Sequence, residues 1–129
     1  MKTILKKHFG YDEFRPLQRE IIEQVMAGGD CVVLMPTGGG KSLCFQLPAM
    51  MLEGVTIVIS PLISLMKDQV DALRTNGIAA DLINSSRTPS EIASVMERLP
   101  AGRQARGGEK LKLLYIAPEL LGAYGFVDF

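Results

Sequence analysis

The sequence contains no tryptophan, one histidine and two cysteines among its 129 residues. The cysteines, Cys31 and Cys44, both lie in apolar segments with no second metal-ligand pair nearby. We therefore expect reduced thiols in the core of a cytosolic protein rather than a disulfide framework. Fourteen basic residues balance fourteen acidic ones. This zero net charge excludes a broad electrostatic coat for DNA or membrane, although it leaves room for a local basic strip.

Long hydrophobic runs are also missing. No apolar run approaches the roughly 20 residues that span a bilayer, and residues 1–7 lack the apolar stretch of a signal peptide. Apolar residues make up 47% and charged residues 22%, which is typical of an ordinary globular domain. We expect a cytoplasmic protein without a membrane partner, associated with the nucleoid if it is bacterial.

Short apolar runs alternate with segments of helical spacing, and the runs predict four strands at residues 31–35, 55–59, 79–83 and 111–116. The first two are almost continuously apolar, as in a parallel sheet that is covered on both faces.

Apolar residues at helical spacing predict a helix between or before each strand. The four begin at Pro16 (with Gly28 as its stop), at Lys41, at Ser60-Pro61 and at the capping box 88–91 (ending near Leu99). Parallel strands need crossover helices, and the chain supplies them. The expected fold class is α/β, an open, mostly parallel sheet with flanking helices.

Residues 100–109 interrupt this alternation with three glycines and two arginines. We expect a surface loop there. Arg103 and Arg106 could meet nucleic-acid phosphate, but a merely solvated loop is the favoured interpretation.

The strongest chemical signal is the segment 35–42, MPTGGGKS, which follows a predicted strand and precedes a predicted helix. Successive glycines let backbone N–H groups converge on one phosphate, and the helix N-terminus adds unpaired donors. Lys41 would bring a positive charge to the β- and γ-phosphates, and Ser42 a hydroxyl ligand for Mg²⁺. The segment predicts a triphosphate site at Thr37, Gly38, Gly39, Gly40, Lys41 and Ser42, with Lys41 as the catalytic residue.

The match to the pattern G-x-x-x-x-G-K-[ST] is incomplete, because Met35 occupies the first glycine position. The alternative is a glycine-rich connector with an incidental lysine. The order of three glycines, lysine and serine between strand and helix favours phosphate binding.

Three further segments surround this loop in a characteristic order: 9–18, 60–69 (SPLISLMKDQ) and 115–119 (YIAPE). With these four motifs the sequence resembles, over nearly its whole length, the N-terminal part of the RecQ family of ATP-dependent DNA helicases in superfamily two. The resemblance implies that residues 1–129 form part of a RecA-like P-loop motor domain, with residues 1–28 as the adenine-recognition arm and first helix. It also implies roles in DNA repair and recombination.

The resemblance implies roles for individual residues in nucleotide binding. Gln18 would hydrogen-bond adenine, since its side-chain amide both donates and accepts. Tyr11 and Arg15 would flank the base as a stacking face and a planar cation. For Tyr11 the alternative is packing of the N-terminal arm on the core, which is the interpretation that we favour for Phe14.

The resemblance also implies contacts with a single strand of DNA, weak in this chain alone. The start of the helix after strand 55–59 would accept a backbone phosphate, while the alternative is a self-sufficient helix cap. The segment after strand 111–116 would lie beside the same DNA strand, at the carboxyl edge of the sheet where ligands collect. The residues concerned are Ser60, Pro61, Leu62, Ser64, Ala117 and Pro118.

The catalytic Asp-Glu-x-His motif that the family places after the Ala-Pro-Glu segment does not occur in the sequence. Glu53, Asp71 and Asp81 are expected in helical or loop contexts without paired spacing and do not replace it. By resemblance, the chain stops before this motif and lacks the C-terminal motor domain. We therefore expect binding of ATP and Mg²⁺ without efficient hydrolysis or unwinding, and a marginal fragment that is prone to associate. A non-catalytic nucleotide- or DNA-binding module is the alternative, and a small P-loop kinase is a weaker one.

Overall fold

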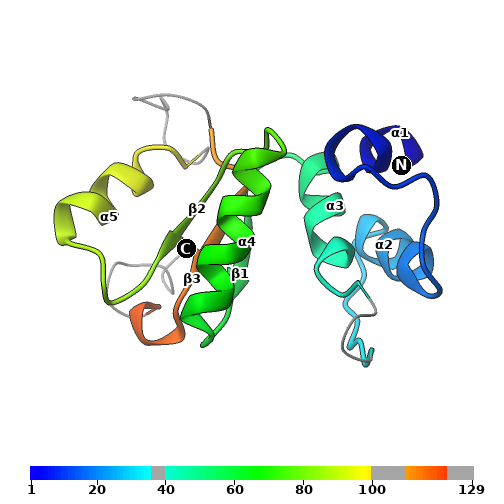
Figure 1. Cartoon of the computed structure of the whole chain (residues 1–129). Helices are drawn as coiled ribbons and strands as arrows, with labels where there is room; N and C mark the ends of the chain where they lie inside the picture. Colours follow the sequence, from blue (N-terminus) through cyan, green and yellow to red (C-terminus); the bar gives the residue numbers. More distant parts are fainter. Residues whose placement is uncertain (36–39, 100–109, 122–129) are drawn as a thin grey trace. The chain divides into compact units, whose positions relative to one another are not determined.

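The computed structural model describes residues 1–35, 40–99 and 110–121, and the chain divides into two compact units, Met1–Glu53 and Gly54–Phe129 (Figure 1). We call these unit 1 and unit 2. The predicted loop at 100–109 lies outside the described residues. Among the described residues, no helix combines the length and apolar character needed to cross a membrane.

The regular secondary structure of unit 1 is helical throughout its described residues. Its core consists of Leu5, Ile22, Leu43 and Leu47, all buried, and Phe14 packs against this cluster as predicted. The helices of this unit are α1 (Lys2–Ile4), the π-helical turn η1 (Leu5–Phe9), α2 (Gln18–Met26) and α3 (Leu43–Met51), and the last three supply the four buried side chains.

Both α2 and α3 begin two residues later than the sequence predicts. Leu17, at the N-cap of α2, has a φ of 72°, a left-handed conformation that is unusual for a residue other than glycine. The predicted stop at Gly28 is confirmed, since α2 ends at Met26 and Gly28 has a φ of 84°. Helix α3 continues through Pro48 without a break. Because it begins at Leu43, Lys41 and Ser42 lie in the turn before it.

The predicted strand at residues 31–35 is wrong. This segment has no regular secondary structure, and Val32 and Leu34 are 92% and 91% exposed. A strand is stabilised by hydrogen-bonded neighbours, and unit 1 contains no strand among its described residues that could pair with it. The expected burial of Cys31 fails for the same reason, because this thiol is exposed.

Three parallel strands of the described chain form the sheet of unit 2. They are β1 (Thr56–Ile59), β2 (Ala80–Ile83) and β3 (Leu113–Ile116), in the order β1-β3-β2. The register aligns Ile59 and Ile83 with Ile116 of the central strand. The α/β class and the three predicted strands of this unit are thereby confirmed.

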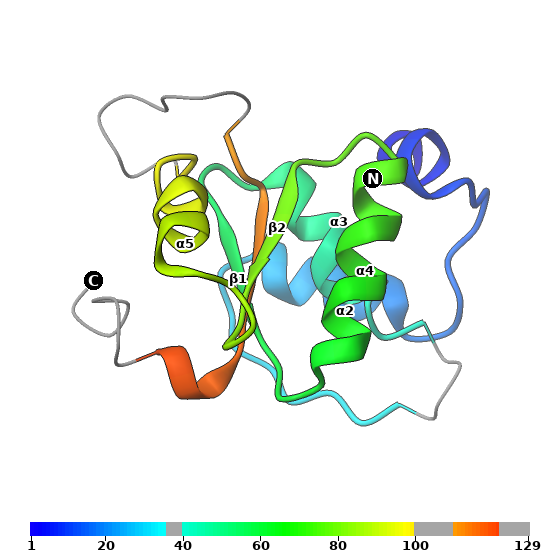
Figure 2. The same ribbon diagram turned by 60° about the vertical axis from the view of Figure 1, so that its left-hand side comes forward.

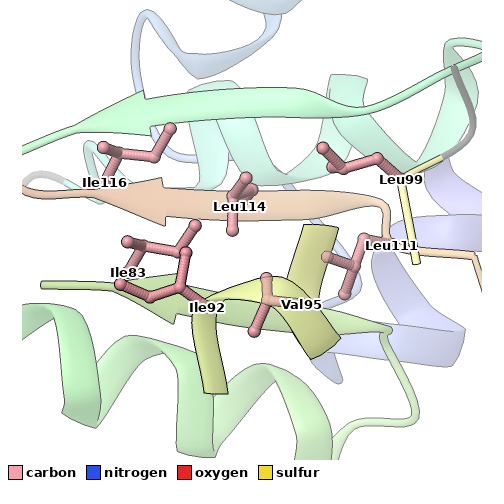
Figure 3. Close-up of a cluster of buried hydrophobic side chains, with 7 residues drawn as sticks. All are labelled: Ile83, Ile92, Val95, Leu99, Leu111, Leu114 and Ile116. Carbon is pink, nitrogen blue, oxygen red and sulfur yellow. The ribbon is translucent and has the colours of Figure 1, made fainter. Parts of the chain in front are cut away.

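Helices α4 (Ile63–Thr75) and α5 (Pro89–Met96) cover opposite faces of this sheet (Figure 2). On one face the hydroxyl of the buried Tyr115 donates to Oε1 of Gln69 on α4 at 2.7 Å. Alternation along β3 places Leu114 and Ile116 on the other face, where they pack with Ile92 and Val95 of α5. Figure 3 shows this second cluster, whose remaining buried members are Ile83, Leu99 and Leu111.

The capping predictions have different outcomes. At α5 the capping box is confirmed: the Glu91 N–H donates to Thr88 Oγ1 at 3.2 Å, and the Thr88 N–H donates to Glu91 Oε1 at 3.0 Å. At α4 the predicted cap is wrong, because the helix begins at Ile63 with Leu62 as its N-cap. The Ser60 hydroxyl instead accepts the Leu62 N–H at 3.2 Å in a local turn.

Candidate functional site

The side chain of Gln18 connects the start of α2 with the end of the glycine-rich loop. Its Nε2 donates to the Gly40 carbonyl at 3.0 Å, and its Oε1 accepts the Arg15 N–H at 2.8 Å. Gln18 is 3% exposed, so both hydrogen bonds are shielded from bulk water. The structure thus brings together two predicted nucleotide-binding segments that are 22 residues apart.

A primary amide carries two N–H groups and an oxygen with two lone pairs. The two bonds of Gln18 use half of this capacity and leave one N–H and one lone pair. These are the donor and the acceptor that an adenine edge needs. The predicted base contact would use this remaining capacity, although the buried side chain presents little surface.

A side chain at Gly40 would require the Gln18 amide to move. Its φ is +80°, and a Cβ placed there would lie 2.2 Å from Nε2 of Gln18. The carbonyl of Gly40 also lies 3.9 Å from Sγ of Cys44. The absence of a side chain at Gly40 is what lets the loop approach Gln18 so closely.

Lys41 and Ser42 lie at the N-terminal end of α3. The Lys41 carbonyl accepts the Cys44 N–H at 3.1 Å, and the Ser42 carbonyl accepts the Gln46 N–H at 2.9 Å, so both residues belong to the turn that starts the helix. The Lys41 side chain is exposed, and the Ser42 hydroxyl makes no capping hydrogen bond. Thr37, Gly38 and Gly39, the other predicted phosphate-binding residues, lie outside the described part of the chain.

The two residues predicted to flank the base, Tyr11 and Arg15, are both exposed. Tyr11 is 54% exposed, and the Arg15 side chain is exposed as well, while its backbone is fixed by Gln18. A hollow of about 360 Å³ is lined by Arg15, Phe14, Pro16 and Arg19 among others, and its lining does not include Tyr11, Gln18 or Gly40. Arginine planes and a proline ring are suitable surfaces against which a planar base can pack.

The predicted burial of Cys44 is confirmed, at 6% exposed. Burial raises the pKa of this thiol, with a smaller contribution in the same direction from Cys31. Cys44 therefore stays protonated near neutral pH and behaves as a small apolar residue beneath the loop.

The two predicted DNA-contacting segments meet at the carboxyl edge of the sheet in unit 2. The Ser60 N–H, directly after β1, donates to the Ile116 carbonyl at 3.2 Å, and the Ala117 N–H, directly after β3, donates to the Ile83 carbonyl at 2.9 Å. Parallel strands bring their carboxyl ends to one edge, where ligands of open α/β sheets bind.

The predicted DNA-contacting residues differ in how exposed they are. Pro61, Leu62, Ser64 and Pro118 are exposed, Leu62 by 57%, whereas Ala117 is buried at 1%. A short 3₁₀ turn, η2 (Pro118–Leu120), follows Ala117. Ala117 can therefore position this turn, but its side chain is not available to a ligand.

Two features of the structure have no counterpart in the sequence predictions. The contact between Gln18 and Gly40 is one, and the surroundings of Asp81 are the other. Asp81 lies in β2, not in a helix or loop as expected, and it is 4% exposed. The position of Asp81 inside an otherwise apolar run was the feature of the sequence that could have indicated a buried, paired carboxylate. Within the described residues, no cluster of histidine, cysteine, aspartate and glutamate could hold a metal ion.

Comparison with known proteins places these motifs in a family. Residues 15–124 match the family model of the DEAD/DEAH box helicases. The ATP-dependent DNA helicase RecQ of Haemophilus influenzae is 51% identical over 117 residues, which is 91% of this chain and 18% of that protein. RecQ of Bacillus subtilis is 49% identical over 127 residues, 98% of this chain and 20% of that protein.

The chain therefore spans about a fifth of the length of these curated relatives. RecQ of Synechocystis extends the same pattern, with 45% identity over 94% of this chain and 24% of its own length. Since the family model covers most of the sequence, the chain belongs to the DEAD/DEAH box helicase family and is related to its RecQ-type members.

Proposed function

We propose that this chain is the nucleotide-binding part of a RecQ-like ATP-dependent DNA helicase and that unit 1 binds ATP. The observation that carries the proposal is the buried side chain of Gln18, hydrogen-bonded both to the arm before α2 and to Gly40 of the glycine-rich loop. A bound nucleotide must touch a base-reading group and a phosphate-binding loop at once. The bond from Gln18 to Gly40 holds those two parts at a fixed separation.

The base would lie against Tyr11 and Arg15, with the remaining hydrogen-bonding capacity of Gln18 directed at the adenine edge. The phosphates would follow the loop from Thr37 to Gly40 toward the N-terminus of α3. There the backbone N–H groups at the helix start and the exposed ammonium of Lys41 favour negative charge. In this arrangement Lys41 is the residue that stabilises charge on the transferred phosphoryl group.

Magnesium is proposed to bind between the phosphates and the Ser42 hydroxyl. A hydroxyl that makes no capping bond at the start of α3 is a suitable hard oxygen donor. One such donor does not hold Mg²⁺ by itself, and the ion commonly binds through substrate phosphates together with few protein ligands. We therefore propose that the ion binds together with ATP.

In unit 2 we propose that the segments after β1 and β3 contact single-stranded DNA. The exposed Pro61, Leu62 and Ser64 at the start of α4, with Pro118 on the neighbouring turn, form the contact surface. Ser60 would not contact DNA itself but would hold Pro61 and Leu62 in position, because its hydroxyl accepts the Leu62 N–H in a local turn. Backbone donors at such a position read phosphates rather than base identity.

Equilibrium binding of a fluorescent ATP analogue tests the nucleotide proposal. Lys41→Ala removes the exposed ammonium and is expected to weaken binding about tenfold or more, because charge-assisted bonds to phosphate are among the stronger polar contacts. Lys7→Ala, which removes an exposed lysine from the same unit outside the site, is the control. Equal affinities of the Lys41→Ala variant and the parent chain would refute the role of Lys41.

A further inference from the structure

Strand β2 lies at one edge of the described sheet, with β3 as its hydrogen-bonded neighbour. The carbonyls of Ala79 and Ile83 face β3, since they accept the N–H groups of Lys112 and Ala117 at 2.8 and 2.9 Å. Backbone groups of successive residues point to alternate sides, so those of Ala80 and Leu82 face outward. Outward groups of this kind are a template on which another strand can pair.

Side chains already occupy three of these outward backbone groups. Nε of Arg74 donates to the Ala80 carbonyl at 2.9 Å, and Nη1 of Arg87 donates to the Leu82 carbonyl at 3.1 Å. The Leu82 N–H donates to Oδ1 of Asp81 at 2.8 Å. A strand arriving at this edge would have to displace all three bonds before it could form its own.

Asp81 holds the arginines in place. Its carboxylate pairs with Nη2 of Arg74 at 3.0 Å, with Nη1 of Arg87 at 2.7 Å and with Nη1 of Arg98 at 3.2 Å. Its side chain is 6% exposed, and a carboxylate so deeply buried requires charged partners of this kind. One aspartate thereby fixes arginines from the last turn of α4, the loop before α5 and the segment after it.

The opposite edge of the sheet differs. The N–H groups of Thr56 and Ser60 bond to carbonyls beside β3, so the backbone groups of Ile57 and Ile59 face away from it. Among the described residues, no side chain bonds to these outward groups, and Ile57 and Ile59 are 46% and 54% exposed. This edge has the apolar, unpaired character that favours strand addition.

We infer that Asp81, together with Arg74 and Arg87, seals the β2 edge against pairing with a strand of another chain, so that within the described residues β1 is the edge of the sheet that stays open. These side chains oppose strand pairing specifically, because they hydrogen-bond to the outward main-chain groups of Ala80 and Leu82 that an added strand would need. This inference concerns unit 2 and does not depend on nucleotide binding by unit 1.

Removal of both guanidinium groups tests the seal. The double variant Arg74→Met and Arg87→Met keeps the aliphatic stems but frees the carbonyls of Ala80 and Leu82. The control, Arg19→Met with Lys67→Met, also removes two cations, each from an exposed pair between residues four apart. Analytical ultracentrifugation and amide hydrogen exchange, both as a function of concentration, report association and the strand that mediates it.

We expect the edge variant to associate at lower concentration than the control and to gain amide protection at Ala80 and Leu82, whose N–H groups face outward. A folded edge variant that associates no more than the control, or that gains protection at β1 alone, would overturn the inference. The parent chain gives a second test if the variant does not fold. Any association of the parent should protect residues 57 and 59, and protection of the Ala80 amide instead would contradict the seal.

Discussion

Gly40 combines a left-handed backbone with a close neighbour, Gln18, whose amide would have to move to make room for a side chain. We predict that Gly40→Ala destabilises unit 1 by about 2 to 4 kcal/mol, because alanine at positive φ costs about 1 to 2 kcal/mol and the displaced Gln18 amide loses a buried hydrogen bond. Gly10→Ala is the matched control, since Gly10 has a similar φ of +77° and open space around its Cα. Chemical denaturation followed by circular dichroism measures both.

The difference in unfolding free energy between Gly40→Ala and Gly10→Ala measures the contribution of the contact with Gln18. Gly10→Ala should show the cost of the backbone conformation alone, about 1 to 2 kcal/mol. Equal losses of stability in the two variants would mean that Gln18 moves aside without cost. The bond between Gln18 and Gly40 would then contribute nothing to the stability of the site.

The sequence predicts roles for single residues but not the contacts between them. A glycine run before lysine and serine indicates phosphate binding, because few other purposes need that backbone freedom next to a cation. The bond from Gln18 to Gly40 could not be predicted, since it joins residues 22 positions apart through a turn whose path no local pattern specifies. The same holds for Asp81, whose three arginines come from separate segments.

Among the helices, α5 offers the clearest test of a local signal. Thr88→Ala removes the hydroxyl that accepts the Glu91 N–H and is expected to destabilise the helix by about 1 kcal/mol. Ser94→Ala is the control, because its hydroxyl donates to the Ser90 carbonyl within the same helix and caps nothing. Hydrogen exchange at the Glu91 amide should accelerate in the first variant and not in the second.

The capping box also makes α5 sensitive to acid. The Thr88 N–H donates to the Glu91 carboxylate and lowers the pKa of Glu91, with a smaller contribution from the Thr88 side chain. The ionised carboxylate therefore stabilises the folded helix at pH values above the ordinary pKa of glutamate, near about 4. This contribution is lost as pH falls through the lowered pKa. Unchanged protection of the Thr88 amide across that range would contradict the prediction.

The strand predictions are confirmed where another strand of the same unit pairs with the predicted one. The runs at 55–59, 79–83 and 111–116 contain β1, β2 and β3, because each strand pairs with another and is covered by a helix. The run at 31–35 is also apolar, but unit 1 has no strand among its described residues that could pair with it. An apolar run indicates the capacity to form a strand, while pairing decides whether the strand forms.

At the scale of the whole molecule, the chain consists of two units with separate cores and separate proposed tasks. Unit 1 holds the candidate nucleotide site around Gln18 and Gly40, and unit 2 holds the sheet edge proposed to meet DNA. Each unit has its own buried apolar cluster. The cluster of unit 1 includes Leu5 and Leu47, and the cluster of unit 2 includes Leu114 and Ile92. The proposed nucleotide binding can therefore be followed at residues of unit 1 within the whole chain.

The central claim is that Gln18 and Gly40 belong to a single nucleotide site. Titration of the isotopically labelled chain with ATP and Mg²⁺, followed by nuclear magnetic resonance, tests it most directly. We predict that the Gln18 side-chain amide and the Gly40 backbone amide shift together and saturate at the same ATP concentration. Shifts confined to other residues, or a Gln18 amide that does not move while ATP binds elsewhere, would contradict the account.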